Sequence, residues 1–448
     1  MPRNGPFGPE ALAQVGRDAA RLAWDGGMTV LRPDGQVVPI ALVAEPEVLE
    51  RDTLAWVAEE SSAILSGAAT LARALLERGD PRDREALLGP FQGLEAEAMQ
   101  RLFTDAPCPA VVSRVDFLVP CDGGWPRALE LNATIPAMPA YADLAAHSWL
   151  RAAARARGMT AGQERELIAA CGSHMEALRE TLVAFYRWRG GTRERPSIAL
   201  VARPGDAQIG ELRRLAEHFR QMGHDACNLV PAEADPDGFD ILYRHVWAHR
   251  TPPESPFARA LLAPGRYVLA NPVNGLLETK ALFARLSETA EDVDLATRAG
   301  LNAREREAAG RLPWTRLHSE ALVPRLLAER ERFVLKRSWD YGGRSVYLGA
   351  EMEPKAWAQL VRAAAADGRG GGFIAQERVF AARWPATRVT PDGVEAGLLY
   401  RDISAYSGLL PVHPRGSVVR AASSPIVNIL GGGGLVPVLP ADVWARLS

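Results

Sequence analysis

An abrupt change in the spacing of apolar side chains constrains this chain most. Residues 9–105 mainly follow helical periodicity, whereas residues 109–136 alternate between apolar and polar side chains. Two alternating runs, PAVVSRVDFLVP and WPRALELNATIP, flank Asp122 and Gly123, a dipeptide typical of a tight turn. We therefore expect a β-hairpin at 109–136, and its register decides which side chains share a face.

Pairing about Gly123 would place Asp116 opposite Glu130 and Arg114 opposite Asn132, on one face of the hairpin. Two opposed carboxylates repel each other unless a cation lies between them. Oxygen ligands on a rigid sheet suit Mg²⁺, which completes its shell with phosphate and water, and Arg114 could stabilise an anionic transition state. A two-residue turn would instead put Asp116 on the other face. The competing interpretation is a surface hairpin in which Arg114 pairs with a carboxylate.

Lysine is nearly absent from the chain, and the positions of the few lysines are informative. Of 52 basic residues, only Lys280, Lys336 and Lys355 are lysine. Lys336 ends an apolar strand-like run just before a glycine pair, and Lys280 lies on an expected helix. A compact ammonium fits against a phosphate where a planar guanidinium does not. The glycine-rich segment 340–346 could close backbone N–H groups over phosphates, although two glycines between strands more often form a simple hairpin turn.

The remaining pattern predicts an α+β protein in five parts. A strand–helix–strand unit with a parallel sheet is expected in the middle of the chain. Its elements are the run SIALVARP, a helix that begins at ELRRLAEHF, and two further apolar runs. The strand-like runs around Lys336 read as antiparallel. The predicted parts are a helical segment at 1–108, the hairpin plus helices at 109–190, the αβ unit at 191–255, a helical region at 256–330, and a strand-rich region at 331–448.

Composition excludes several classes of protein. The net charge is −2, so no global basic field favours nucleic acid. No segment approaches the ~20 apolar residues of a membrane span, and the opening residues lack the apolar centre of a signal peptide. The four cysteines are widely spaced, which predicts reduced, mostly buried thiols in a cytoplasmic protein. A homodimer is the candidate assembly.

His245 and His249 have the i, i+4 spacing of a metal-chelating pair on a helix. The run before them is strand-like, however, and no third ligand is near in sequence. We therefore predict a structural or substrate-contact role for the two histidines. No nucleophile elbow, Walker A loop or GxGxxG fingerprint occurs, so a protein nucleophile is not expected.

Together these motifs resemble the ATP-grasp superfamily. SRVDFLVPCDGGWPRALELNATIPAM is similar to the closing metal-binding hairpin of D-alanine–D-alanine ligases, with its Arg-x-Asp run followed by Glu-x-Asn. In that family the nucleotide-binding lysines precede the hairpin, whereas here they follow it. This order resembles the circularly permuted ATP-grasp proteins, a group that includes glutathionylspermidine synthase-like enzymes. The resemblance implies a permuted ATP-grasp fold and a pre-ATP-grasp αβ domain at 191–255. Residues 1–105 match no part of it, but they stand where a permuted chain must bridge its two halves, which suggests a helical cover over the site.

The resemblance also assigns roles to individual residues. It implies Mg²⁺ ligands at Asp116, Glu130 and Asn132. It implies ATP contacts from Lys280, Lys336, Gly342, Gly343, Ser345, Gln376, Glu377 and Arg378. It places Arg114, Arg420 and Asn428 at the reacting end, and Asp402 near the ribose or a metal.

The activity that the resemblance implies is an ATP-dependent carboxylate–amine ligase that works through an acylphosphate and releases ADP and phosphate. ATP and Mg²⁺ are the implied cofactors. A small carboxylate and an amine, such as amino acids or peptides, are the implied substrates, with Arg244 or Arg401 as guesses for holding the acid. The alternatives are a small-molecule kinase and a non-catalytic nucleotide-binding protein.

Overall fold

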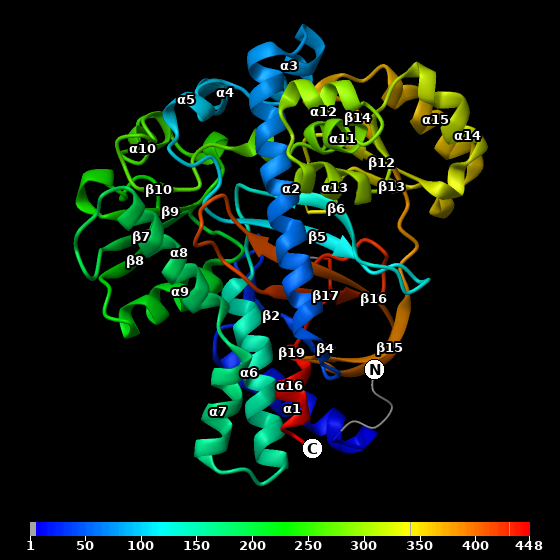
Figure 1. Cartoon of the computed structure of the whole chain (residues 1–448). Coiled ribbons are helices and arrows are strands. Elements are labelled where there is room, and N and C mark those ends of the chain that lie inside the picture. Colours follow the sequence, from blue (N-terminus) through cyan, green and yellow to red (C-terminus); the bar gives the residue numbers. More distant parts are fainter. Residues whose placement is uncertain (1–5, 341, 430) are drawn as a thin grey trace.

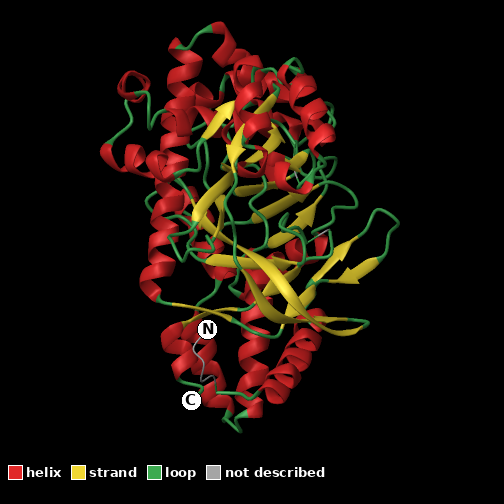
Figure 2. Ribbon diagram, turned by 90° about the vertical axis from the view of Figure 1, so that its right-hand side faces the viewer, coloured by secondary structure: helices red, strands yellow, loops and turns green. Residues whose placement is uncertain are grey.

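The computed structural model describes residues 6–340, 342–429 and 431–448, and it is a mixed α+β structure (Figure 1). Its three larger sheets have seven, four and four strands. Figure 2 shows strands in the middle of the molecule with helices packed around them. The segment Gly342–Ser345 is described, whereas Tyr341, which lies within the predicted glycine-rich segment 340–346, and Leu430 are outside the described residues.

The seven-stranded sheet joins distant parts of the chain in the order β15-β3-β18-β17-β16-β5-β6. The predicted hairpin, β5 and β6, forms one edge because β5 pairs with β16 from the C-terminal region. The strand bounds are β3 Ala41–Val43, β5 Ser113–Leu118, β6 Arg127–Asn132, β15 Arg383–Thr390, β16 Gly393–Ser407, β17 Ser417–Ala422 and β18 Gly434–Val436.

The hairpin register agrees with the prediction. Asp116 pairs with Glu130 and Arg114 pairs with Asn132. A bulge follows Asp116, so Phe117 pairs with Ala128 and the register shifts toward the turn. The alternative two-residue turn is therefore wrong, and both predicted pairs lie on one face of the sheet.

A four-stranded antiparallel sheet carries Lys336. Its order is β11-β14-β12-β13, with bounds β11 Thr315–Leu317, β12 Phe333–Arg337, β13 Val346–Leu348 and β14 Phe373–Glu377. Phe333 and Leu335 pack with Trp357 of α15 (Pro354–Ala365) in one hydrophobic cluster. Side chains alternate along a strand, so Val334 and Lys336 project from the other face. Lys336 therefore points away from the hydrophobic cluster that packs on its own sheet.

The predicted strand–helix–strand unit is present as a parallel sheet of order β10-β9-β7-β8. The strands are β7 Ile198–Ala202, β8 Ala226–Leu229, β9 Ile241–His245 and β10 Leu269–Ala270, and α9 spans Ile209–Gln221. The helices before this sheet also agree with the pattern: α6 Pro139–Ala156, α7 Ala161–Cys171 and α8 His174–Trp188.

The long helix α2 (Arg51–Arg78) crosses the seven-stranded sheet (Figure 1). Its buried residues share a cluster with Val115, Phe117 and Ala405, which alternate with Arg114 and Asp116 along the sheet. α2 therefore covers the face opposite those polar side chains. The helical cover suggested for the N-terminal residues is therefore not formed over the candidate site by α2.

The N-terminal region also contains four strands that helical periodicity did not predict. After α1 (Pro9–Asp25) come β1 Thr29–Leu31, β2 Val37–Pro39, β3 Ala41–Val43 and β4 Glu47–Leu49. Each strand has three residues, too few for an alternating pattern to be visible in sequence. β3 takes its place in the seven-stranded sheet by pairing with β15 and β18.

The other elements are short or peripheral. The remaining α-helices are α3 Pro81–Leu88, α4 Gly93–Gln100, α5 Leu102–Asp105, α10 Ala258–Leu262, α11 Lys280–Glu288, α12 Val293–Ala299, α13 Ala303–Arg311, α14 Val323–Ala328 and α16 Ala441–Ala445, and β19 spans Val438–Pro440. Among the described residues, no helix combines the length and apolar character needed to cross a bilayer. The four cysteines are free thiols, as expected, but the prediction that most are buried is wrong, because only Cys108 is buried, Cys121 is exposed, and Cys171 and Cys227 are half-buried.

A buried carboxylate ties the αβ unit to the start of α6. Glu211 of α9 is 1% exposed, and its Oε1 accepts a hydrogen bond from the Ala140 amide at 3.2 Å. Its Oε2 has no partner among the described residues. Burial raises the pKa of Glu211 to about 7, more than its backbone hydrogen bonds lower it.

We expect the Glu211 carboxyl to make stability depend on pH. Because its pKa is raised in the folded state, the folded protein binds the proton that the unfolded chain releases, so this contribution is lost as pH rises from about 4.5 through 7. Glu211→Gln should flatten the fall in melting temperature between pH 5 and 8. Glu217→Gln, on the exposed part of the same helix, should leave the profile unchanged. Identical pH profiles for wild type and Glu211→Gln would contradict this assignment.

Candidate functional site

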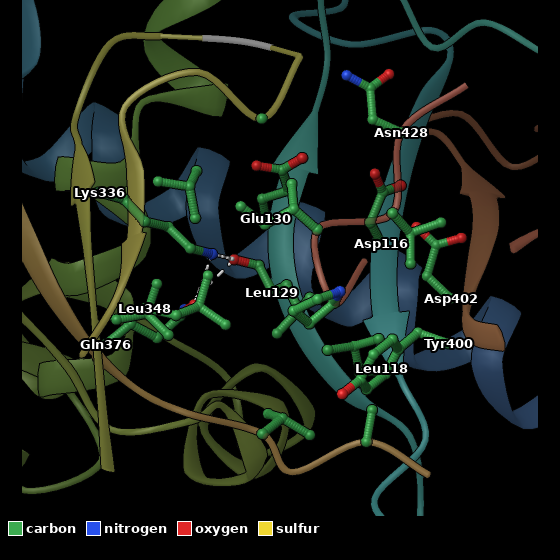
Figure 3. A pocket seen from close by; sticks show the side chains of 18 of the residues that line it. Asp116, Leu118, Leu129, Glu130, Lys336, Leu348, Gln376, Tyr400, Asp402 and Asn428 are labelled. Atoms are coloured by element: carbon green, nitrogen blue, oxygen red, sulfur yellow. Dashed lines mark hydrogen bonds between the residues drawn. The ribbon is translucent and has the colours of Figure 1, made fainter. Parts of the chain in front are cut away.

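A cavity of about 230 Å³ lies between the seven-stranded sheet and the sheet that carries Lys336. Figure 3 shows Glu130 and Asp116 on the strands of the first sheet and Lys336 and Gln376 on the second, around the same space. The residues come from β5, β6, β16 and β17 on one side and β12, β13 and β14 on the other. The cavity therefore exists only where two distant parts of the chain meet.

Most of the predicted site residues line this cavity. They are Arg114, Asp116, Glu130, Asn132, Lys336, Gly342, Gly343, Gln376, Glu377, Arg378, Asp402, Arg420 and Asn428. Lys280 lines a smaller adjoining cavity of about 50 Å³, whose lining also includes Glu130, Asn132 and Gly342. Ser345 lines neither of the two cavities.

Lys336 is buried at the wall of the larger cavity. Its Nζ donates to Gln376 Oε1 at 2.7 Å and to the Leu129 carbonyl at 3.4 Å (Figure 3). Burial lowers the pKa of Lys336 to about 8, opposed by the nearby Glu130 carboxylate, which raises it. An ammonium whose hydrogen-bond partners are all neutral can form a charge-assisted hydrogen bond with an added anion.

Lys280 approaches the same carboxylate from the helical side. It is the first residue of α11, and its Nζ donates to the Asp340 carbonyl at 2.8 Å. It also lies 3.6 Å from Glu130 Oε2. Two of the three lysines in the chain are therefore placed near Glu130, whereas Lys355 is exposed on α15.

Two arginines neutralise Asp116. Arg114 donates from Nε and Nη2 to the two carboxylate oxygens at 2.7 and 2.9 Å, and Arg420 Nη2 donates to Oδ2 at 2.9 Å. Arg420 also pairs with Asp402, where Nε lies 3.1 Å from Oδ1. Burial acts to raise the pKa of Asp116, but both guanidinium groups outweigh it and lower the pKa to about 2. Asp116 is thus an ionised, buried partner of arginine.

This arrangement gives Asp116 partners that the sequence did not predict. Both of its oxygens accept hydrogen bonds from guanidinium groups, so Asp116 fixes the two arginines, and its assignment as a Mg²⁺ ligand stays a prediction. The repulsion expected between Asp116 and Glu130 is relieved by Arg114 and Arg420, not by a cation held between the carboxylates.

Oxygen donors suited to a hard cation nevertheless gather in the adjoining small cavity. Glu130, Asn132 and Asp340 all line it. The Nδ2 atom of Asn132 is buried without a hydrogen-bond partner among the described residues; as an N–H donor it suits a phosphate oxygen, whereas a metal ion would bind the Oδ1 atom. No group of three His, Cys, Asp or Glu side chains in the described residues could hold a metal ion, so any such site depends on the Asn amide together with phosphate and water. The donor set therefore fits Mg²⁺ bound together with a phosphate.

Asp340 is the site residue to which sequence reasoning gave no role. It lies four positions after Lys336 at the start of the glycine-rich segment, and this position next to a predicted phosphate-binding motif is the feature that could have indicated a role. Its Oδ2 accepts a hydrogen bond from Ser345 Oγ at 2.8 Å. Ser345, expected to contact ATP, acts in this structure by holding Asp340.

The glycine-rich segment reaches across to the C-terminal loop. Gly342 and Gly343 have φ of 67° and 74°, in the left-handed region that favours glycine. The Gly342 carbonyl accepts a hydrogen bond from Asn428 Nδ2 at 2.7 Å, and a Cβ on Gly343 would lie 2.8 Å from Ile426. The glycines thus allow the segment to close against the loop that carries Asn428.

The far end of the cavity has apolar walls. Leu118, Leu129, Val334, Leu348 and Val379 line it, which suits a flat apolar ring system. Glu377 and Arg378, predicted to contact ATP, also line the cavity, and their side chains form ion pairs. Glu377 pairs with Arg332 at 2.9 Å, and Arg378 lies 3.6 Å from Glu351.

The histidine interpretation agrees with a structural role. His245 Nε2 lies 3.2 Å from Gln208 Oε1, whereas His249 Nδ1 lies 3.1 Å from Glu95 Oε2. The two rings therefore have different neighbours and do not form a chelating pair.

The guesses about Arg244 and Arg401 are wrong. Arg244 is fully buried, and its guanidinium donates to the carbonyls of Asn271, Val246 and Pro272. Arg401 pairs with Glu47 of β4. Because Arg401 alternates with Asp402 along β16, it points to the face of the sheet opposite the cavity.

Comparison with known proteins gives a structural relative only. No family model matches the chain, and no curated protein matches it. The structure is similar to a glutathione synthetase-like effector from Globodera pallida, solved in its apo form, with a TM-score of 0.62 and 13% sequence identity. The alignment covers 97% of this chain and 98% of that protein. At this identity the likeness concerns the fold alone: the chain has a glutathione synthetase-like α+β fold.

Proposed function

We propose that this protein is an ATP-dependent carboxylate–amine ligase of the ATP-grasp class. The observation that carries the proposal is the meeting of Glu130 and Lys336, from separate sheets, at one cavity. The cavity has an apolar end for a purine ring, and at the other end it meets a small cavity lined by a second lysine and several oxygen donors. This layout matches the polarity of a nucleoside triphosphate along its length.

The side chains divide the proposed reaction between them. Lys336, Lys280 and the Gly342–Gly343 backbone would hold the phosphates, and Glu130, Asn132 and Asp340 would hold Mg²⁺. The metal would offset negative charge on the phosphates. A substrate carboxylate oxygen attacks the γ-phosphorus and ADP leaves. An amine then attacks the acyl carbon, loses a proton, and expels inorganic phosphate to leave an amide.

Arg114 and Arg420 would stabilise the oxyanion that forms when the amine attacks. Their positions are fixed by Asp116 and Asp402, and fixed donors stabilise developing charge without reorganising. The chain order supports a circular permutation as part of this proposal, because the hairpin bearing Glu130 precedes the strand bearing Lys336. The near-complete alignment with the glutathione synthetase-like effector supports the fold class.

Nucleotide binding should be visible as thermal stabilisation. A ligand at 100 times its Kd stabilises the folded state by about 2.7 kcal/mol. We therefore expect ATP with Mg²⁺ to raise the melting temperature by several degrees, with a smaller effect from ATP in EDTA. GTP should stabilise less if the apolar end is shaped for adenine. An unchanged melting temperature with millimolar ATP and Mg²⁺ would contradict the assignment of the cavity.

Turnover distinguishes the ligase from its alternatives. Pooled acids and amines should stimulate release of ADP and free phosphate in equal amounts. Phosphate retained on an acceptor would indicate a kinase. Stabilisation by ATP without turnover would indicate a nucleotide-binding protein that has lost catalysis, a reading favoured by the fact that the structural relative is an effector.

A further inference from the structure

The side chain of Gln376 lies on the same face of its sheet as the Lys336 ammonium. Gln376 is 1% exposed on β14, where it pairs with Thr315 of β11 on one side and with Val334 of β12 on the other. Successive side chains of a strand point to opposite faces, and Ala375, the preceding residue, packs in the hydrophobic cluster of the other face. Gln376 therefore points to the cavity side of the sheet, as Lys336 does.

The direction of the hydrogen bonds fixes the orientation of the Gln376 amide. Thr315 Oγ1 donates its proton to the Pro313 carbonyl at 2.8 Å, because a carbonyl can only accept. The same oxygen is therefore an acceptor for Gln376 Nε2, which lies 3.2 Å away. Nε2 also donates to the Leu129 carbonyl at 3.3 Å, so Oε1 is left to accept from the Lys336 ammonium at 2.7 Å. The opposite orientation would bring the amide nitrogen against the ammonium and the amide oxygen against the Leu129 carbonyl.

A bulge in the facing sheet supplies the second acceptor for the lysine. In the pairing of β5 with β6, Leu129 is the extra residue between Ala128 and Glu130 and has no partner on β5. Its carbonyl accepts hydrogen bonds from Lys336 Nζ, at 3.4 Å, and from Gln376 Nε2 (Figure 3). Lys336, Gln376 and Leu129 thus form a ring of three hydrogen bonds that joins the two sheets at the wall of the cavity.

Both of these acceptors are neutral, which keeps the lysine available to an anion. A carboxylate in the place of the amide would form an ion pair with Lys336 and compete with a phosphate for it. Among the charged groups nearby, Glu130 of β6 and Asp116 of β5 favour the protonated form of the lysine, whereas Lys280 of α11 opposes it. An amide oxygen orients the ammonium and leaves its positive charge unneutralised.

We propose that Gln376 is a positioning residue for Lys336: its amide holds the ammonium at the cavity wall, between the two sheets, where it can meet a phosphate of the nucleotide. Gln376 acts on the nucleotide through the lysine. Its role toward Lys336 follows from these contacts alone, whereas the consequence for nucleotide binding rests on the proposed function.

NMR of the lysine side chains tests this inference directly, because the chain has only three lysines. Lysine labelled with ¹³C at Cε is incorporated into the full-length protein, and the Cε shifts are followed against pH without nucleotide. The Lys336 signal is the one that is absent from Lys336→Met. Its titration midpoint in the wild type, expected at about pH 8, is the reference.

Two substitutions of similar size should move this midpoint in opposite directions. Gln376→Glu places a carboxylate against the ammonium, so the midpoint should rise by about one pH unit or more. Gln376→Met removes the acceptor and leaves the burial of the lysine less opposed, so the midpoint should fall. Gln359→Glu, at an exposed glutamine of α15, is the control for the change of residue type and should titrate as the wild type does.

The affinity for ATP is the second readout. Gln376→Glu should bind ATP about tenfold or more weakly than the wild type, because its carboxylate competes with phosphate for the lysine. The inference is overturned if a folded Gln376 variant keeps the wild-type midpoint, or if Gln376→Glu binds ATP as tightly as the wild type. A wild-type protein that binds no ATP would overturn the proposed function instead, since the lysine titration is read without nucleotide.

Discussion

Glu130→Gln should reduce ATP turnover by about 10²-fold or more while leaving the melting temperature within a few degrees of wild type. Glu130 is partly exposed to the cavity, and its nearest basic group, Lys280, lies 3.6 Å away and retains a hydrogen bond to the Asp340 carbonyl. The substitution preserves shape and removes one negative charge, so it acts on the bound cation and phosphates more than on the fold. The measurement is the initial rate of ADP release at saturating ATP and Mg²⁺.

Asp122→Asn is the matched control for this variant. Asp122 is an exposed carboxylate in the turn of the same hairpin, and its Oδ1 accepts a hydrogen bond from the Gly124 amide, which an asparagine oxygen can also accept. Its turnover should equal that of wild type. A Glu130→Gln enzyme with wild-type turnover would show that this carboxylate has no part in the reaction.

Lys336→Met should weaken ATP binding and lower turnover by about 10²-fold or more, because a buried ammonium facing a phosphate is lost. Methionine fills a similar volume, and removing a buried charge relieves a desolvation cost, so the melting temperature should not fall much. Lys355→Met, on the exposed surface of α15, is the control with the same change of residue type.

The pKa of Lys336 predicts how the affinity for ATP depends on pH. Its pKa is lowered to about 8 by burial, so the free protein loses this positive charge as pH rises through 8. ATP binds the charged form, and its affinity for wild type should therefore fall between pH 7 and 9. Lys336→Met should bind weakly with a flatter profile over the same range. Equal pH slopes in the two proteins would mean that the lysine does not contact the nucleotide.

Local pattern predicted much of the secondary structure and part of the site. Alternating side chains predicted the hairpin with Asp116 opposite Glu130, and the strand–helix–strand spacing predicted the parallel sheet. These features depend on residues close in sequence, where periodicity and turn chemistry act directly. The three-residue strands near the N-terminus were not predicted, because three residues are too few to show an alternating pattern of apolar and polar side chains.

The pairing of charged groups was not predictable from sequence. Nothing in the sequence near Asp116 indicates that Arg420 will neutralise it, since the two residues meet only because β16 lies between β5 and β17. The two guanidinium groups that engage Asp116 were for this reason not foreseen, and its assignment as a metal ligand stays a prediction. The same long-range packing places Asp340 beside Glu130 and Asn132.

The sequence by itself determined the longer strands, the face that each side chain takes along them, and where the scarce lysines stand. Only the tertiary structure decided which cavity carboxylates are held by arginine, as Asp116 and Asp402 are, and which lies near a lysine, as Glu130 does. The physical reason is that side-chain direction follows from the local backbone, whereas ionisation and hydrogen bonding depend on every group that packs nearby, however distant in sequence.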